Sequence, residues 1–568
     1  MGNYDDLDRD TLLRLLRRRD AERQLGLVWE RDEIDADGAL NTDFVALNLD
    51  AALSHGDAPW DNLIIEGDNF DALRALRVSH KEAIRCIYID PPYNTGNRDF
   101  VYNDRFVDKN HRFRHSLWLD FMYQRLTLAK ELLTDDGVIL VSIDDHEVFR
   151  LGMLMDRVFG EDNKAGTVIW KNVTDNNPSR VVKEHEYILA YCRNIARCPP
   201  VWKSADLAAK TLLLDKESEL LSSGLGGNEL QSAYTSWFRS VKEQLTPLDN
   251  YKYIDGGGIY AGSRSVHNPG KEGYRYDVIH PGSGLPCKQP LMGYRFPEET
   301  MRGLLQSDRI IFGDDETKLI ELKTYAADYK QKLASVIDLD GRSGVNELKA
   351  IFGGHKAFNN PKPVQLLADI LSYVTSGNDV VLDFFAGSGT TAHAVAKLNS
   401  EDGGARKFIL VSSTEATDQS PTKNLCRDVC AERMRRVQGG YENAKGESVK
   451  GLGGGFAYMR ARRIPTHRLT QKLDHGEIWN ALQLLHGSPL TVWQGGGFAA
   501  AQCERVGADF AYLSDAYPAS HSRMEEWLEA RGSQRATIYT WSPERYRTSR
   551  SPHDWRAIPQ QLRERFGR

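Results

Sequence analysis

The sequence has 568 residues, a formal net charge of −6, 41% hydrophobic residues and 27% charged residues. This length allows three or four domains, and the negative balance excludes a polybasic coat for nucleic acid, so any DNA contact needs a local basic surface. No apolar run approaches the roughly 20 residues that span a bilayer, the acidic N-terminal stretch has no signal-peptide core, and seven scattered cysteines indicate a reducing compartment. We therefore expect a cytoplasmic protein without membrane contact.

Residues 1–50 are predicted to be an N-terminal helical extension. Leucines and arginines over residues 7–30 follow the pattern of a charged amphipathic helix. A solvated docking helix and a contact with DNA or a second subunit fit this pattern equally well.

Residues 51–164 predict one half of a doubly wound α/β sheet, because strand and helix patterns alternate. A short strand over 62–66 ends at Gly67 and Asp68, a helix follows, and the apolar run 83–89 predicts the second strand of a β-α-β unit. The Asp68 carboxylate could accept a hydrogen bond from an adenine amino group. An ordinary Gly-Asp turn explains the same two residues.

The turn Asp90-Pro91-Pro92-Tyr93 follows that second strand directly and continues as Asn-Thr-Gly over 94–96. An acidic residue at the carboxyl end of a strand lies where open α/β sheets bind ligands. Two prolines supply carbonyl acceptors without N–H donors, which suits a substrate that brings an amino group. Tyr93 adds a flat face on which a base can stack. A rigid turn without function is the alternative.

The half-sheet continues beyond this turn. Residues 97–114 predict a long aromatic-rich loop, and loops of this length are usually functional or mobile. Residues 118–133 have the spacing of a core helix, and 138–143 predict a buried strand.

Residues 165–350 predict a separate, mixed α+β insert, because glycine clusters interrupt the strand signals at 167–170 and 187–191. Exposed basic, amide and aromatic side chains there would be available for groove contacts. The pair Glu321 and Lys323 resembles part of a nuclease metal site, but this spacing is common by chance.

Residues 351–465 predict the second half of the sheet. Pro363 suits the first position of a helix, after which the strand 380–382 leads into Asp383-Phe384-Phe385-Ala386-Gly387-Ser388-Gly389-Thr390-Thr391 and a further helix. A strand, a Gly-x-Gly turn and a helix start let the backbone approach a ligand closely. The loop lacks the third glycine of the dinucleotide fingerprint and the Gly-Lys-Ser/Thr ending of a phosphate loop.

The strand 408–411 runs toward Glu415, an acidic group that could hold ribose hydroxyls. Cys426 and Cys430 lack a second Cys or His pair, so we expect packed thiols and no metal site. Residues 466–568 are predicted to form a small C-terminal domain, whose stretch from residue 543 holds seven arginines against three acids.

Together the motifs resemble those of DNA amino-methyltransferases. Asp-Pro-Pro-Tyr is similar to their catalytic motif, and the loop from Asp383 is similar to their S-adenosylmethionine motif. Their reversed order in this chain resembles the β group. Three sequence motifs resemble those of the modification (Mod) subunits of Type III restriction-modification systems: Glu-Gly-Asp-Asn, Asp-Pro-Pro-Tyr-Asn-Thr-Gly and Phe-Asn-Asn-Pro-Lys-Pro.

The resemblance implies a circularly permuted, Rossmann-like fold that binds S-adenosylmethionine, with a target-recognition domain as the insert. It places the cofactor loop at Asp383, Phe385, Ala386, Gly387, Gly389 and Thr390. It also places Glu415 on the cofactor ribose, Asp68 on its adenine, and Asn360 and Lys362 near its methionine end.

The implied reaction is methylation of the N6 amino group of an adenine flipped out of duplex DNA. Asp90 and the Pro91 carbonyl would accept the two amino hydrogen bonds, and the base would stack on Tyr93. Asp at the first motif position favours adenine over cytosine N4. Catalysis would be mainly positioning and electrostatics.

Two other functions stay open at this point. One is amino-methylation of an RNA base, against which the motif order argues. The other is a DNA-binding specificity subunit without activity. The resemblance implies a homodimer and a possible helicase-nuclease restriction partner, although a solitary modification enzyme would have the same sequence features.

Overall fold

The structure, a computed structural model, describes residues 8–14, 43–96, 101–102, 105–106, 114–172, 180–204, 208–245, 248–267, 270–416, 420–503, 508–514, 517, 519–531, 535–546 and 553–558. The chain divides into two compact units, residues 1–43 and residues 44–568. In the first unit residues 9–14 are helical. The rest of the helix predicted over 7–30 lies outside the described residues, as does most of the loop predicted over 97–114.

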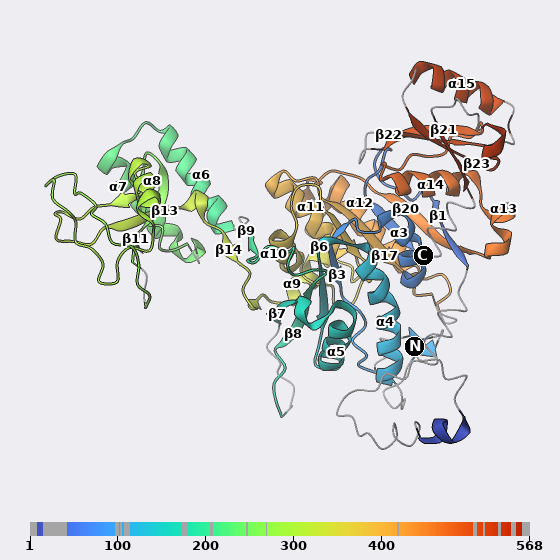
Figure 1. The fold of residues 1–568 in the computed structure, drawn as a ribbon, viewed down its shortest axis with the longest axis horizontal. Helices are drawn as coiled ribbons and strands as arrows, with labels where there is room; N and C mark the ends of the chain where they lie inside the picture. The colour runs from blue at the N-terminus through green and yellow to red at the C-terminus, as the bar shows by residue number, and fades with distance from the viewer. Residues whose placement is uncertain are drawn as a thin grey trace. The chain divides into compact units, whose positions relative to one another are not determined.

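The second unit is built around a ten-stranded sheet in the order β1-β20-β2-β17-β16-β3-β6-β8-β7-β15 (Figure 1). The strands from β20 to β6 are parallel, while β1 and β8 run antiparallel to their neighbours. The strand bounds are β1 Phe44–Leu49, β20 Ala457–Ile464, β2 Leu63–Glu66, β17 Lys407–Ser412, β16 Val380–Asp383, β3 Ile84–Ile89, β6 Leu133–Ile143, β8 His185–Cys192, β7 Lys164–Lys171 and β15 Val336–Asp338.

Helices cover this sheet on both faces, which confirms the predicted doubly wound α/β class. Strand β3 is buried along almost its whole length because its alternate side chains enter two layers. Cys86 and Tyr88 share a buried cluster with Leu367, Val395 and Met434, whereas Ile87 and Ile89 are buried outside that cluster. The helices of the first layer are α10 Val364–Val374, α11 Thr390–Asp402 and α12 Glu432–Gly439, and those of the second are α3 Asn69–His80, α4 Arg114–Leu132 and α5 Val148–Phe159.

The predicted β-α-β unit is present in sequence, but its two strands are not neighbours. Strands β17 and β16, which follow more than 290 residues later, lie between β2 and β3 in the sheet. The predicted boundaries of the N-terminal extension and of the insert also differ from the extent of the main sheet. Strand β1 lies inside the range predicted as the N-terminal extension, and β7, β8 and β15 lie inside the range predicted as the insert, yet all four belong to the main sheet.

The insert proper has its own sheet and its own cores. Its elements are α6 Ala208–Ser222, α7 Gly227–Val241, β10 Tyr253–Asp255, β11 Gly258–Ser265, α8 Glu298–Gln306, β12 Ile310–Ile311 and β13 Glu321–Tyr325, with the sheet order β10-β11-β13-β12. A two-stranded ribbon of β9 (Lys203–Ser204) and β14 (Gln331–Lys332) joins it to the main sheet. Two buried clusters lie within the insert, which therefore has hydrophobic cores separate from that of the main sheet.

Helix α9 (Arg342–Ile351) returns the chain to the main sheet, and α10 begins one residue later than predicted. Pro363 is the N-cap residue of α10, and the Val364 N–H donates to Glu347 Oε2 at 3.0 Å. The carboxylate therefore satisfies a helix-start N–H that Pro363 has no side-chain oxygen to accept.

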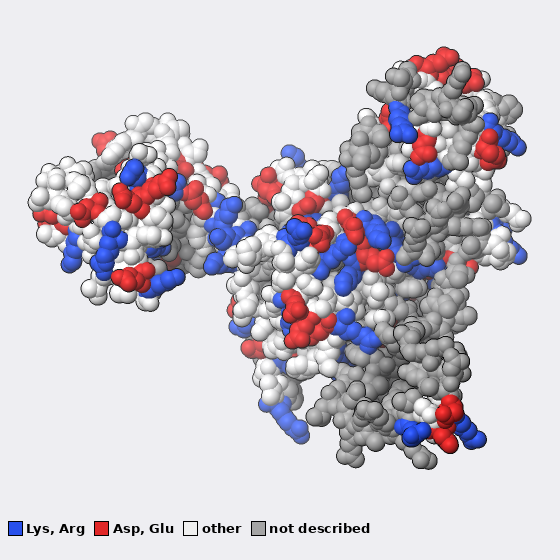
Figure 2. All heavy atoms as spheres, in the orientation of Figure 1, with Lys and Arg blue, Asp and Glu red and all other residues white. Residues whose placement is uncertain are grey.

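The C-terminal region contains α13 Leu469–Lys472, α14 His475–His486, β21 Phe498–Cys503, β22 Ala508–Leu513, α15 Ala519–Arg531, β23 Ala536–Thr540 and β24 Asp554–Ala557. Its four strands form a separate sheet with its own buried cluster. None of the helices in the described ranges is both long and apolar enough to cross a membrane. Basic and acidic side chains are interspersed on the face drawn in Figure 2.

Candidate functional site

Two acidic residues meet at the carboxyl edge of the main sheet. Strands β3 and β16 are parallel neighbours, with Cys86 paired to Val381 and Ile87 paired to Leu382. Asp90 follows the last residue of β3, and Asp383 is the last residue of β16. The two motifs predicted from distant parts of the sequence therefore lie side by side, at the edge where open α/β sheets bind ligands.

Asp90 belongs to a compact cluster of four polar side chains. The Lys362 ammonium lies 3.1 Å from Asp90 Oδ1 and 2.9 Å from Glu186 Oε2. It also donates to the Tyr93 hydroxyl at 2.7 Å, and that hydroxyl lies within hydrogen-bond distance of both carboxylates, 2.8 Å from Asp90 and 2.7 Å from Glu186. The Lys362 ammonium lies 5.0 Å from the centre of the Tyr93 ring. One cation thus holds two carboxylates and a phenol in a fixed arrangement.

Burial and charge oppose each other in this cluster. Burial raises the pKa of the Asp90 carboxyl and Glu186 raises it further, while Lys362 lowers it, with a raised pKa as the result. Burial disfavours the Lys362 charge, but Asp90 and Glu186 outweigh it and raise the pKa of the ammonium. Burial, then Asp90 and Glu186, raise the pKa of Tyr93 well above 10. Tyr93 is therefore a neutral hydrogen-bond donor.

The turn after Asp90 is held from its far side. The Trp118 indole N–H donates to the Pro92 carbonyl at 2.7 Å. Asn94 is fully buried at a φ of +57° and donates to Glu147 at 2.6 Å. No described residue donates to the Pro91 carbonyl. Asp90 and Pro91 therefore present acceptors at a turn that is held through the Pro92 carbonyl and the Asn94 side-chain amide.

The loop from Asp383 to Thr390 is organised by the Asp383 carboxylate. Its Oδ1 accepts from the Phe385 N–H at 2.9 Å and its Oδ2 accepts from the Thr391 hydroxyl at 2.6 Å. Burial raises the pKa of this carboxyl to about 7. Both oxygens are used inside the loop, so Asp383 shapes the loop from within.

Both glycines of this loop have left-handed backbone conformations, with φ of +49° at Gly387 and +79° at Gly389. A Cβ at Gly389 would lie 3.2 Å from Cys430 Sγ and 3.3 Å from its carbonyl oxygen. The residues before, between and after them, Ala386, Ser388 and Thr390, are buried. Helix α11 starts at Thr390 without a side-chain cap. The loop therefore offers free helix N–H groups beside a tightly packed backbone.

The remaining predicted site residues are placed differently. Asp68 caps α3 by accepting from Phe70 N and Asp71 N, and its other oxygen binds Arg125 at 3.2 Å. Glu415 forms an exposed ion pair with Lys423 at 2.7 Å. Asn360 is exposed at a φ of +52°. Lys362 was predicted at the methionine end of a cofactor, whereas the structure places its ammonium in the Asp90 cluster. The cofactor roles of these residues stay predictions.

Glu186 was missed by the sequence analysis. It lies near the start of β8, within the range predicted as insert, and Asn172 donates to its second oxygen at 2.8 Å. The available signal was an acidic residue beside an apolar strand. This signal could not place Glu186 in the site, because nothing in the local pattern shows that β8 pairs antiparallel with β6 in the main sheet.

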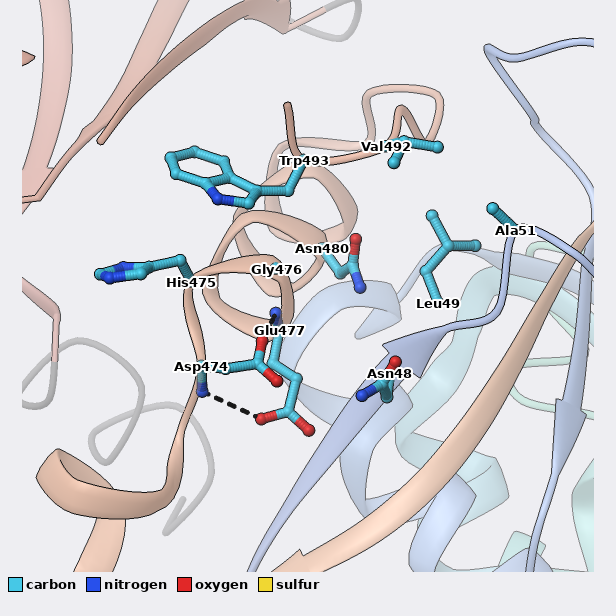
Figure 3. A pocket seen from close by; sticks show the side chains of 10 residues that line it. All are labelled: Asn48, Leu49, Ala51, Asp474, His475, Gly476, Glu477, Asn480, Val492 and Trp493. Atoms are coloured by element: carbon cyan, nitrogen blue, oxygen red, sulfur yellow. Dashed lines mark hydrogen bonds between the residues drawn. The ribbon is translucent and has the colours of Figure 1, made fainter. Parts of the chain in front are cut away.

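One cavity of about 390 Å³ lies away from this site, between β1 and the start of α14 (Figure 3). The carboxylate of Glu477 in its wall accepts from the Asp474 N–H and binds Arg462, so its charge is already matched. No group of three or more His, Cys, Asp or Glu side chains in the described part of the chain is arranged to hold a metal ion.

A doubly wound sheet with a carboxylate turn and a glycine loop at adjacent strand ends defines a Rossmann-like methyltransferase fold. Residues 84–416 match the family described as DNA methylase, which comprises N6 and N4 methyltransferases. The chain belongs to this family.

Three relatives illustrate the similarity. The chain is 49% identical to the Type III restriction-modification enzyme EcoP15I Mod subunit of Escherichia coli over 66% of this chain and 63% of that protein. It is 32% identical to the StyLTI Mod subunit of Salmonella typhimurium, over 73% and 62%. It is 29% identical to the Type II methyltransferase M.KpnI of Klebsiella pneumoniae, over 61% and 79%.

The match spans about three-fifths of the length of the two Mod subunits, and it confirms the resemblance to Mod subunits predicted from the sequence. Among solved structures, the putative DNA modification methylase TTHA0409 of Thermus thermophilus, in complex with S-adenosyl-L-methionine, aligns over 69% of this chain and 98% of that chain. Its sequence identity is 14% and its TM-score is 0.29.

Proposed function

We propose that the protein is an S-adenosylmethionine-dependent DNA methyltransferase that modifies the N6 amino group of adenine within a Type III restriction-modification system. The observation that carries this proposal is the adjacency of Asp90 and the Asp383 loop on neighbouring parallel strands. An acceptor turn and a ligand loop at one sheet edge can hold two reactants next to each other.

The loop residues fit the proposed cofactor. When bound, S-adenosylmethionine supplies a methyl group activated by its sulfonium. Phe358 and Cys430 occupy the space that a Cβ would need at Gly387 and Gly389, so the absence of side chains at both positions lets the loop backbone pack closely there. The uncapped start of α11 offers N–H groups to the methionine carboxylate.

The Asp90 turn supplies the chemistry on the substrate side. The conjugated amino group of a purine is a weak nucleophile, and acceptance of its two hydrogen bonds by Asp90 and the Pro91 carbonyl directs its lone pair outward. Lys362, 3.1 Å from Asp90 Oδ1, favours the ionised form of this carboxylate and fixes its orientation. Catalysis by this chain is therefore positioning and electrostatic stabilisation, without a covalent intermediate on the protein.

Adenine N6 is favoured over cytosine N4 by the residue type at Asp90 and by the similarity to the Mod subunits. The target amine is inaccessible in a duplex, so the base must be flipped into the site. Duplex DNA is the proposed substrate, and the insert the proposed reader of its sequence. A second copy of this chain and a helicase-nuclease restriction subunit are the proposed protein partners.

The test is modification-sensitive single-molecule sequencing of DNA from cells that express the wild type or Asp90→Ala. We expect N6-methyladenine at one short recurring motif in the wild type and none in the variant. Asp135→Ala, which removes an exposed carboxylate of the same domain, is the matched control and should retain the modification. Methylcytosine in the wild-type sample would change the proposed target base from adenine to cytosine. A wild-type sample without methylated bases would overturn the proposal. Transfer of labelled methyl groups to RNA would then support the RNA alternative.

A further inference from the structure

Arg433 is a buried cation that the proposed reaction does not use. It lies on α12, is 0% exposed, and donates to Ser388 Oγ at 3.1 Å and Thr390 Oγ1 at 2.8 Å. It also reaches the Ser388 carbonyl at 3.4 Å and His393 Nδ1 at 3.3 Å. Every one of these partners belongs to the Asp383 loop or to the first turn of α11.

This guanidinium has no carboxylate partner within ion-pair distance among the described residues, and its Nε makes no hydrogen bond there. Burial lowers the pKa of Arg433 to about 10, while Glu347 acts in the opposite direction. The group therefore stays charged at neutral pH. A buried charge whose hydrogen-bond partners are two hydroxyls, a carbonyl and an imidazole, with no carboxylate in direct contact, is costly unless an anion completes the site.

The same place has a second, independent feature. Helix α11 begins at Thr390 with Gly389 as its N-cap residue and without a side-chain cap, so its first N–H groups have no side-chain acceptor. A helix of 13 residues carries partial positive charge at this end. The helix end and the Arg433 guanidinium both contribute positive potential to the loop.

We propose that Arg433 is a positioning residue that makes the loop selective for the carboxylate of the cofactor's methionine moiety. This inference rests on the proposed function, because S-adenosylmethionine carries one anionic group, that carboxylate. Arg433 donates to the oxygens of Ser388 and Thr390, which fixes the loop around Gly389, and its charge favours an anion at the helix start. Its contribution should therefore depend on the carboxylate and not on the adenosine.

The experiment compares two probes by calorimetry on the full chain. S-adenosylmethionine and its decarboxylated analogue differ only by the carboxylate. Wild type should bind the first more tightly. Arg433→Met should weaken S-adenosylmethionine binding by about ten-fold or more and change binding of the analogue by less than about three-fold. Arg435→Met, on the same helix, partly exposed and paired with Glu432, is the matched control and should change neither affinity.

Equal losses for both probes in Arg433→Met would show a merely structural role and overturn the inference, as would no loss at all. If Arg433→Met does not fold, Arg433→Lys decides. Lysine keeps the positive charge at this position. If folded Arg433→Lys protein still binds S-adenosylmethionine more tightly than the decarboxylated analogue, the proposal is supported, and if it binds both equally, the proposal is contradicted. A wild type that binds neither probe would instead overturn the proposed function itself.

Discussion

Two carboxylates share one lysine in the candidate site, so the charge state of Asp90 depends on its neighbours. Burial raises the pKa of Asp90, Glu186 raises it as well, and Lys362 lowers it. Tyr93 joins the cluster as a neutral donor. An ionised carboxylate is a stronger acceptor for an amino group than a protonated one, so activity should be lost as pH falls through the raised pKa of Asp90.

The loss of activity at low pH is the acidic limb of the pH profile. Substitutions of Lys362 and Glu186 should shift this limb in opposite directions. Lys362→Met removes the group that lowers the pKa of Asp90, so the acidic limb of kcat/KM should move to higher pH by about one unit. Glu186→Gln removes a group that raises this pKa, so the limb should move to lower pH. The pH profiles of kcat/KM measure both effects, with Lys356→Met, an exposed lysine nearby, as the control. A shift of both variants in the same direction would contradict this electrostatic account.

Among the elements, the ribbon of β9 and β14 has an unusual charge pattern. Lys203 and Lys332 are directly opposite each other in the antiparallel register, and Lys330 is also exposed. Like charges in this arrangement repel, and no acidic side chain in the described ranges forms an ion pair with any of the three. Basic side chains are visible where the ribbon joins the insert to the sheet (Figures 1 and 2). Under the proposed function, these lysines are predicted to contact DNA phosphates.

Removing these charges should therefore change the salt dependence of DNA binding. In the double variant Lys203→Gln and Lys332→Gln, the slope of log K against log salt should fall by about two, because each phosphate contact contributes roughly 0.9. The loss of affinity should be the same for DNA with and without the recognition motif. Lys318→Gln, whose ammonium is paired with Asp314, should leave the slope unchanged. An unchanged slope in the double variant would place the phosphate contacts elsewhere.

At the scale of the whole molecule, the candidate site and the insert, which is the proposed reader of DNA sequence, belong to separate parts of the fold. Glu186 and Asp383 lie in strands of the main sheet, Asp90 directly follows β3, and Lys362 precedes α10. The insert has its own cores and is joined to the main sheet by the ribbon of β9 and β14. Ser204 and Gln331 are paired neighbours across this ribbon. A two-residue turn can close such an antiparallel pair.

Replacement of residues 205–330 by Asn-Gly should therefore leave a folded protein. We expect its affinity for S-adenosylmethionine to stay within about three-fold of the wild-type value, because the Asp383 loop and α11 are untouched. Methylation at the specific motif should be lost. Calorimetry and methyl-transfer assays on the shortened chain measure the two properties. Loss of cofactor binding together with methylation would show that the insert supports the loop.

The sequence by itself determined the local parts of the site. An apolar strand followed by Asp90 and two prolines, and a strand followed by the Gly387 and Gly389 turn, have local patterns whose physical reasons act over a few residues. These patterns predicted the α/β class, the strand ends and the family resemblance. The buried partner of α11, Arg433, had no such signal, because its burial depends on packing between helices.

The tertiary structure decided which parts meet. Strands β16 and β17 lie between β2 and β3, β8 pairs antiparallel with β6, and Lys362 reaches Asp90 across more than 270 residues of sequence. Pairing between distant strands depends on register and burial over the whole sheet, and periodicity along one segment carries no information about its partner. For that reason Glu186 and the cluster around Lys362 are found only in the folded chain.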